Sequence, residues 1–454
     1  MQIVFLEIII SQFIHTVMRT LKCMVLGALT VASMPATMLA QTVDLNLQKA
    51  IEIALAENPT IKIADKDIRL KEIADKEAWQ SLLPTVSSQL ALQHSIKVAA
   101  IKTPNGEFKM GKDGTTTATG GITLSLPIYA PAVYQNMKLT KDDILLAQEK
   151  ARSSRLSLIN QVTKAYYAAL LAKDSRDVIQ RSYDVSKENF DVVDKKFQVG
   201  KVSEYDKISA EVQMRSMNSS VTSAQTGLEL AILQLKVLMG INTDFDIVIN
   251  DSLKAYENSV TLSNTESNEN EIENNSSLRQ IDMNMGLLKR ADKILRTNFL
   301  PTIGMQIAGT YQSYSNDDWN VFGYKYSPSS TLSISVNIPI FTASNWTKLK
   351  SSKIKMEQLS DTRVNTVRQL NMAAKSYRKN MLTSISKLES DRQAVMQADK
   401  AVSISAKRYD VGKGTILELN QSETALTQAE LTYHQSIYDF LTNKADLDYT
   451  LGRE

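Results

Sequence analysis

The sequence predicts a mainly helical α+β chain built from two copies of one unit, each a pair of β-strands followed by long helices. Three observations support this prediction. Short motifs recur in the same order in both halves, four segments alternate apolar and polar residues, and long stretches contain no proline. No proline occurs between Pro131 and Pro301 or after Pro339, as expected of very long helices.

The first forty residues have the features of an export signal. Arg19 and Lys22 precede an apolar run over residues 24–31, and small residues follow up to Ala40. We expect residues 1–40 to be a signal peptide, with Met18 as an alternative start. Cys23 is the only cysteine and precedes the apolar run, so neither a lipid anchor nor a disulfide is expected in the mature chain.

Composition narrows the classes of function. The formal net charge is only +3, so no nucleic-acid partner is expected. No mature segment approaches the roughly 20 apolar residues of a membrane-spanning helix. His94 and His434 lie in different segments, and no phosphate loop, nucleophile motif or metal-ligand cluster appears. We therefore expect no catalytic, cofactor or metal site, and the chain is not predicted to be an enzyme.

Four motif pairs define the internal repeat. Residues 83–85 (LPT) recur at 300–302 (LPT), 126–129 (LPIY) at 338–341 (IPIF), 197–201 (FQVGK) at 409–413 (YDVGK), and 238–240 (LMG) at 450–452 (TLG). The first pair is offset by 217 residues and the others by 212. We predict repeats at 41–241 and 276–454, separated by a polar, acidic and mobile linker over 242–275.

The strands, four in all, are predicted at about 86–99, 120–128, 303–314 and 331–340. In the first, Val86, Leu90 and Leu92 alternate with polar or small residues, and the other three behave alike. The polar positions carry almost no charge. Aromatic residues cluster near the strand ends: Tyr129, Tyr311, Tyr314, Trp319, Phe322, Tyr324, Tyr326 and Phe341. This pattern favours strands of an outer-membrane barrel over a soluble half-buried sheet. Four strands cannot close a barrel, so oligomerisation is expected.

The helices are predicted at about 131–198, 203–239, 343–408 and 415–451. The first would extend about 100 Å at 1.5 Å per residue. Gly200 and Gly412 interrupt the helical pattern, and helix resumes at Ser203 and Thr415. Glycine suits the turn and a hydroxyl suits the next helix cap. Each repeat is thus expected to end in a hairpin of long helices.

With this repeat in place, the chain resembles the TolC family of outer-membrane efflux proteins. The resemblance extends from residues 43–45 (VDL) to 451–452 (LG). It is carried by the two LPT motifs, by the Y-x-V-G-x-x-T segment at 409–415 and its twin at 197–203, and by residues 50–59 (AIEIALAENP). It implies a homotrimer whose twelve-stranded barrel, surrounded by outer-membrane lipid, continues as a helical periplasmic tunnel. It also implies a periplasmic adaptor and an inner-membrane pump as partners.

The resemblance also assigns candidate sites. The hairpin ends would dock the adaptor: Val199, Gly200, Lys201, Ser203, Val411, Gly412, Lys413 and Thr415. Residues near these turns would close the tunnel, with Asp206 and Glu418 as acidic rings: Val202, Asp206, Ser209, Tyr409, Gly414, Glu418 and Gln421. The family's gate has an arginine where this chain has Gly414, so Lys201 and Lys413 are the substitutes to consider. Strand–helix junctions are expected at Pro84, Pro127, Pro301 and Pro339.

Several alternatives remain open at this point. Within the duct class, efflux of drugs and other small toxic compounds competes with type I protein secretion and with metal efflux. The lack of Met- or His-rich stretches argues against the last of these. From another class, a soluble periplasmic coiled-coil adaptor would also have an export signal and long helices, but with one hairpin beside a separate β-domain.

Overall fold

The computed structural model describes residues 43–104, 106–109, 112–260, 269–316 and 321–453; the predicted signal peptide lies outside these residues. The chain divides into two compact units, Met1–Val43 with Phe245–Val248, and Asp44–Asp244 with Ile249–Glu454. β6 (Ile247–Val248) and Val43 of β1 (Val43–Asp44) belong to the smaller unit, and these two strands form a two-stranded sheet. All other helices and strands belong to the larger unit.

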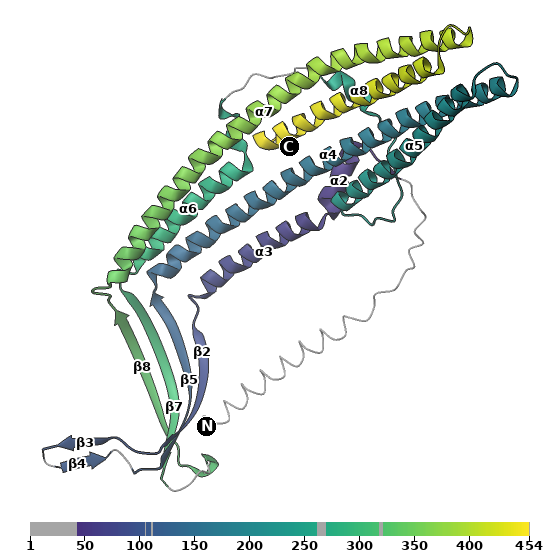
Figure 1. Cartoon of the computed structure of the whole chain (residues 1–454). Helices are drawn as coiled ribbons and strands as arrows, with labels where there is room; N and C mark the ends of the chain where they lie inside the picture. The colour runs from purple at the N-terminus through teal and green to yellow at the C-terminus, as the bar shows by residue number, and fades with distance from the viewer. Residues whose placement is uncertain (1–42, 105, 110–111, 261–268, 317–320, 454) are drawn as a thin grey trace. The chain divides into compact units, whose positions relative to one another are not determined.

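A four-stranded antiparallel sheet lies at one end of the larger unit (Figure 1). Its order is β2 (Thr85–Ser95), β5 (Thr115–Tyr129), β7 (Thr302–Ser315) and β8 (Ser327–Asn337). Successive side chains of a strand point to opposite faces, so the register decides which residues share a face. In β5, Leu124 lies opposite Val86 on one side and Ile307 on the other, and Ile307 lies opposite Leu332.

The apolar residues of all four strands therefore lie on one face of the sheet. This face is exposed, with Leu90 at 85% and Ile122 at 61%. The opposite face carries small and polar side chains; Thr123, for example, pairs with Ser87 and Ala308. The predicted alternation is confirmed, and the sheet has one continuous apolar and one uncharged polar face.

The strand boundaries differ from those predicted in three of the four strands. β2 ends at Ser95 rather than near residue 99. β5 begins at Thr115 rather than near 120, and β8 spans Ser327–Asn337 rather than 331–340. The four predicted barrel strands are all present in this sheet, and the described chain also contains short strands outside it. Between β2 and β5 the chain forms a hairpin of β3 (Ala100–Thr103) and β4 (Gly106–Lys109), with Ile101 opposite Phe108. Its short strands lack the long alternation used to find the other four.

The long helices match the predicted ranges closely. α4 (Pro131–Gln198) and α7 (Ala343–Asp410) each have 68 residues, and α5 (Glu204–Met239) and α8 (Ile416–Leu451) each have 36. α4 packs against α5, and α7 against α8. The shorter α2 (Leu47–Glu57), α3 (Pro59–Gln80) and α6 (Ser276–Thr297) pack along α4, and α6 also packs against α7. No described helix is long and apolar enough to span a membrane.

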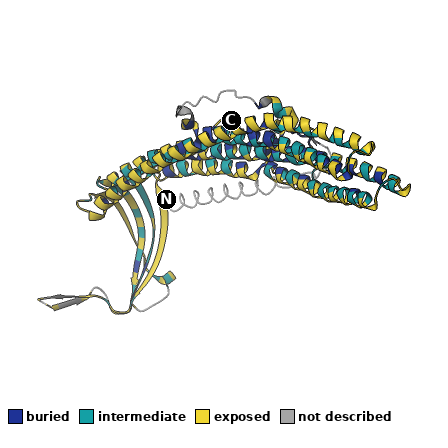
Figure 2. Cartoon of the chain, turned by 45° about the horizontal axis from the view of Figure 1, so that its top comes forward, coloured by how far each residue is buried: buried dark blue, intermediate teal, exposed yellow. Residues whose placement is uncertain are grey.

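The helical core is thickest midway between the sheet and the hairpin turns. Figure 2 shows buried residues gathered there, whereas much of the sheet and of the hairpin ends is exposed. Fully buried side chains include Tyr166 and Leu170 of α4 and Ile437 and Phe440 of α8. Burying a large apolar side chain contributes about 1.5–3 kcal/mol, so this region stabilises the helical packing most strongly.

Two asparagines each cap the start of one helix and hydrogen-bond to the end of another. Asn58 caps α3 by accepting from Thr60 N–H at 2.8 Å, and its amide donates to the Leu238 carbonyl at 2.7 Å. Asn275 caps α6 in the same way and donates to the Thr450 carbonyl at 2.8 Å.

The helices that end beside these asparagines stop at left-handed glycines. Gly240 has a φ of +71° and Gly452 a φ of +68°. A Cβ at either glycine would come within 3.0 Å of the backbone next to or at the capping asparagine. Both joints thus need glycine, because its backbone adopts a positive φ freely and because there is no space for a Cβ atom.

Segment 242–275, predicted as a mobile linker, packs in part against the helices. Its described residues include η1 (Leu253–Ser259) and η2 (Glu269–Asn274), and η1 packs on α4 and α8. Leu253 is fully buried, and Ile272 belongs to an apolar cluster with Ala374, Leu447 and Leu451. A few apolar residues in a polar sequence are enough to anchor this segment, while 261–268 lies outside the described residues.

Candidate functional site: the two hairpin ends

Both hairpins turn through the same backbone arrangement, at the end of the helices far from the sheet (Figure 1). Gly200 has a φ of +69° and Gly412 a φ of +73°. The N–H of Gly200 donates to the Phe197 carbonyl at 2.9 Å, and that of Lys201 to the Lys196 carbonyl at 2.8 Å. Gly412 and Lys413 repeat both bonds, at 3.1 and 2.8 Å. This pair of bonds is a Schellman motif, which requires the left-handed conformation that glycine adopts freely.

The next helices start with the predicted hydroxyl caps. Ser203 accepts from the N–H of Asp206 at 3.2 Å, and the Asp206 carboxylate accepts from the Ser203 N–H at 3.1 Å. These bonds form a capping box. Thr415 accepts from the N–H of Glu418 at 3.2 Å. The Asp206 carboxylate is therefore a structural acceptor as well as a negative charge near the turn.

An apolar cluster holds the two hairpins together close to their turns. Val193 of α4, Ala210 of α5 and Ile416 and Leu419 of α8 are all buried. Phe190, Val202, Ala406 and Tyr409 pack around them. Two of the predicted gate residues, Val202 and Tyr409, are thus partly buried in the contact between hairpins.

The Tyr409 side chain is partly buried among charged groups. Its hydroxyl is buried, and no hydrogen-bond partner for it is found among the described residues. Burial raises the pKa of this hydroxyl, and the negative charges of Asp206 and Asp410 raise it further. The Lys196 ammonium lies 4.9 Å from the centre of the Tyr409 ring and 3.6 Å from the Asp410 carboxylate.

Ion pairs link the helices at the same level. Lys207 of α5 contacts Asp194 of α4 at 2.7 Å. This hydrogen bond is the main reason that the pKa of Asp194 is lowered and that of Lys207 is raised. Arg408 of α7 lies 3.6 Å from the Glu418 carboxylate and also donates to the Lys413 carbonyl at 3.2 Å.

Arg408 is a cation beside Glu418, whereas the sequence had indicated Lys201 and Lys413. Gly414 is the position where the resemblance led us to expect an arginine. A Cβ at Gly414 would approach the Arg408 Cβ at 3.1 Å and the Tyr409 nitrogen at 3.2 Å. The close approach of the turn to α7 thus favours glycine at 414, while a guanidinium reaches Glu418 from position 408.

Ser209 and Gln421, two other predicted gate residues, share an open groove between α5 and α8. The groove has a volume of about 500 Å³. Its apolar lining is exposed in the single chain, with Tyr205 at 65% and Leu417 at 47%. Asp206 and Glu418 do not line this groove, so the predicted gate residues fall into separate groups.

One buried carboxyl near the hairpin ends went unnoticed in the sequence. Glu423 of α8 is 6% exposed and accepts from the Asn189 amide of α4 at 2.5 Å. Burial raises the pKa of Glu423, whereas the Asn189 hydrogen bond lowers it. Glutamate in a helix is usually a surface residue, so no pattern in the sequence indicated this contact.

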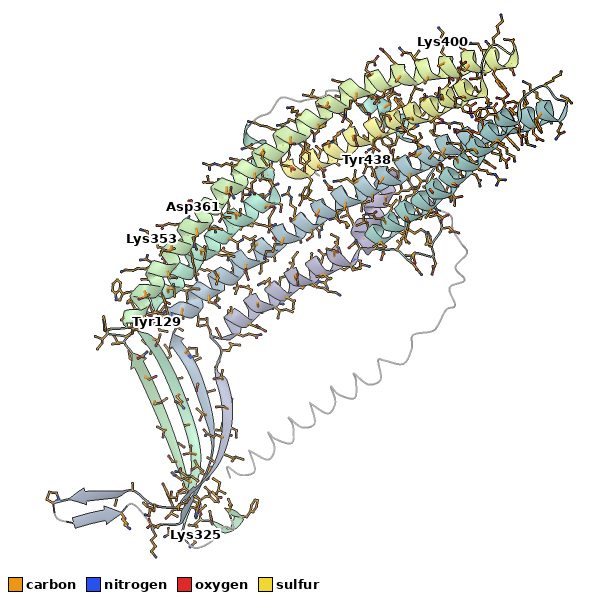
Figure 3. The ribbon with its side chains drawn as sticks, in the orientation of Figure 1. Tyr129, Lys325, Lys353, Asp361, Lys400 and Tyr438 are labelled. Atoms are coloured by element: carbon orange, nitrogen blue, oxygen red, sulfur yellow. The ribbon has the colours of Figure 1, made fainter. Side chains whose placement is uncertain are left out.

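The four prolines lie where strands and helices meet, with one difference. Pro84 and Pro301 directly precede β2 and β7, and Pro339 lies between β8 and α7. Pro127 lies inside β5, at a register irregularity before the strand ends at Tyr129. Tyr129 is labelled at this boundary in Figure 3. Proline lacks an N–H for the sheet ladder, which accounts for the irregularity.

The described residues contain no group of three or more histidine, cysteine, aspartate or glutamate side chains placed to hold a metal ion.

Comparison with known proteins identifies the family. A model described as "outer membrane efflux protein" matches residues 50–241 and 269–453. The chain belongs to the outer membrane efflux protein family. It is accordingly an outer-membrane protein, as predicted, and the soluble adaptor is disfavoured.

Individual proteins similar to this chain include outer-membrane channels and a secretion protein. The chain is 22% identical over 433 residues to outer membrane protein TolC of Salmonella enteritidis, covering 90% of this chain and 82% of TolC. It is 22% identical over 411 residues to the alkaline protease secretion protein AprF of Pseudomonas aeruginosa, covering 90% and 84%. Among solved structures, the Campylobacter jejuni CmeC outer membrane channel has a TM-score of 0.72 at 17% identity, covering 90% and 86%.

Proposed function

We propose that this efflux protein is one subunit of a homotrimeric duct that carries small toxic compounds out of the cell. Three four-stranded sheets would form a twelve-stranded barrel, and the helices would continue it as a tunnel into the periplasm. The single observation that carries the proposal is the sheet, which has a continuous apolar face and, within the described chain, strands β2 and β8 paired on one side only.

The unpaired edges explain why other copies are needed. A free strand edge in hydrocarbon leaves backbone N–H and carbonyl groups without partners, at a cost of several kcal/mol each. Pairing β2 of one copy with β8 of the next removes both edges. The number three comes from the family resemblance, because the edges alone require closure but do not set the number of copies.

The duct itself would be passive. Energy would come from an inner-membrane pump, connected through a periplasmic adaptor that docks on the hairpin ends around Gly200 and Gly412. The exposed Val199 and Val411, at 67% and 68%, offer the adaptor an apolar contact next to each glycine. Opening and closing would then be a movement of these helical ends.

Export of small compounds is tested by deleting the gene and measuring susceptibility to a panel of dyes, detergents and antibiotics. We expect increased susceptibility to several compounds, restored by the wild-type gene but not by a variant that fails to reach the outer membrane. Unchanged susceptibility to the whole panel would contradict the proposal of small-molecule efflux.

Type I protein secretion is the second candidate, supported by the similarity to AprF over most of both chains. In that case deletion would remove one or a few proteins from the culture medium and leave susceptibility unchanged. The identity of neighbouring genes, which would encode the pump and adaptor, offers an independent distinction between the two.

We further propose that Asp206 and Glu418 form acidic rings around the axis of the trimer, which would favour cations. Asp206→Asn and Glu418→Gln remove the charges and keep hydrogen-bonding atoms. Single-channel recordings should show reduced cation selectivity for both, while Glu204→Gln in the same first turn serves as control. Unchanged selectivity in both variants would exclude the rings.

A further inference from the structure

The outer end of the apolar face carries an open slot. The loop after β7 contains η3 (Val321–Gly323) and is closed by a hydrogen bond from the Tyr326 hydroxyl to the Val321 carbonyl, at 2.9 Å. Val321, Phe322 and Tyr326 line a hollow of about 540 Å³. Its other side is the sheet, through five residues of the apolar face: Leu90, Leu92, Ala118, Gly120 and Tyr311. Ala91 and Thr119, which lie between them on the opposite face, complete the lining.

The register places these sheet residues on the apolar face. Leu90 pairs with Gly120, which pairs with Tyr311, and Leu92 pairs with Ala118. Residues 321–326 therefore lie over the apolar face, which meets lipid in the proposed barrel, rather than over the polar face. Ala118 is only 4% exposed, although Leu90 beside the slot is 85% exposed. The slot is thus partly covered and opens onto the lipid-facing surface.

Phe322 is the most exposed large apolar residue in the described chain, at 101%. A phenylalanine fully exposed to water gains nothing from the hydrophobic effect, whereas contact with hydrocarbon stabilises it. It lies next to a floor of small residues, Ala118 and Gly120, which leaves room for an apolar chain. Since the chain is an outer-membrane protein, the apolar molecules at this surface are lipid acyl chains.

Charge at the same end of the sheet indicates the kind of lipid. Lys325 adjoins Tyr326 of the slot and is labelled beyond the strand ends in Figure 3. Lys97 and Lys112 flank the outer ends of β2 and β5 and are exposed. Lysine ammonium groups at the membrane surface attract anionic lipid headgroups.

We propose that the slot binds an acyl chain of a phosphorylated outer-leaflet lipid, lipid A, whose phosphates contact Lys97, Lys112 and Lys325. The inference uses the proposed orientation, with the helices on the periplasmic side and this loop at the outer surface. It concerns lipid bound to the outside of the barrel and is independent of what the duct exports.

The test measures lipid retained by the full-length protein. Protein purified from outer membranes is washed in mild detergent, and bound lipid A is quantified by mass spectrometry. We expect about one lipid A per chain in the wild type, and about tenfold less in Phe322→Ser, because loss of one aromatic contact changes affinity by about this factor. Phe341→Ser is the control, since Phe341 is also highly exposed, at 78%, but lies beyond the other end of the sheet.

A second comparison tests the phosphate contact. Delipidated protein is incubated with lipid A or with phosphatidylethanolamine, in the wild type, in Lys97→Gln/Lys325→Gln and in the control Lys353→Gln/Lys400→Gln on α7. The first double variant should lose preference for lipid A, and the control should keep it. Equal retention by Phe322→Ser and wild type would overturn the slot. Equal binding of both lipids by wild type would overturn the phosphate contact. Export assays of the same variants remain a separate measurement, so failure here leaves the proposed duct untouched.

Discussion

Gly200 and Gly412 have nearly identical backbone angles because both end a 68-residue helix and start a reversal. Sequence spacing alone located both glycines and the hydroxyl caps after them. It did not locate their polar neighbours. Arg408, Asn189 and Glu423 meet partners on other helices, and such contacts depend on how the hairpins pack.

Replacing Gly412 with alanine should destabilise the protein. A Cβ there meets no atom within 4 Å, so the cost comes only from the positive φ, at about 1 kcal/mol. Thermal unfolding should show a lower midpoint for Gly412→Ala. Gly227→Ala in the middle of α5, where a Cβ also meets nothing, should raise the midpoint, because alanine favours helix. An equal effect of both would refute this explanation.

Glu423 should make stability depend on pH. Its pKa in the folded protein is raised by burial, so the folded state binds the proton more tightly than the unfolded state. The contribution of this carboxyl to stability is therefore greatest below the ordinary value of 4.5 and falls as the pH rises through the raised folded pKa. As the pH rises from 4 to 8, Glu423→Gln should lose less stability than the wild type, measured by unfolding both proteins at each pH. Parallel curves would contradict the prediction.

For helices and strands, patterns in the sequence predicted which elements are present better than they predicted where the elements begin and end. The four long helices match within two residues, since their ends are marked by proline, glycine and hydroxyl caps. The start of β5 was placed too late because its first residues, Thr115–Thr117, do not alternate with apolar ones. The β3–β4 hairpin and the anchored η1 were missed, because each depends on few residues.

The joint at Asn275 should be worth more than an ordinary helix cap. Asn275→Ala removes both the cap of α6 and the hydrogen bond to the Thr450 carbonyl, so we expect a loss of about 2–3 kcal/mol. Asn46→Ala removes only an exposed cap at α2, with an expected loss of about 1 kcal/mol. Denaturant unfolding of both variants measures the difference, and equal losses would show that the interhelical bond contributes nothing.

At the scale of the whole molecule, the two faces of the sheet decide where the protein can reside. The sequence showed that apolar and polar residues alternate in each strand. Only the pairing showed that the apolar sets of all four strands coincide on one face, since a shift by one residue in any strand would have moved its set to the other.

Adjacent residues of β5 provide a direct test of this arrangement. Ile122→Lys puts a charge on the apolar face, at a cost of about 2–4 kcal/mol near the centre of a bilayer. We expect loss of the protein from outer-membrane fractions. Thr123→Lys, on the polar face, should reach the membrane in normal amount and alter only ion conductance. The same amount of both variants in the membrane would contradict the assigned faces.

The helices, their turns and the alternating strands could be predicted from the sequence alone, because these depend on residues close together in the chain. Proline, glycine and hydroxyl residues mark where these elements begin and end, and the spacing of apolar residues distinguishes helix from strand. Contacts between residues far apart in the sequence emerged only from the tertiary structure. They are the common apolar face, the asparagine joints, the partners of Arg408 and Glu423, and the slot beside Phe322. These contacts follow from strand register and helix packing, which depend on the whole chain at once.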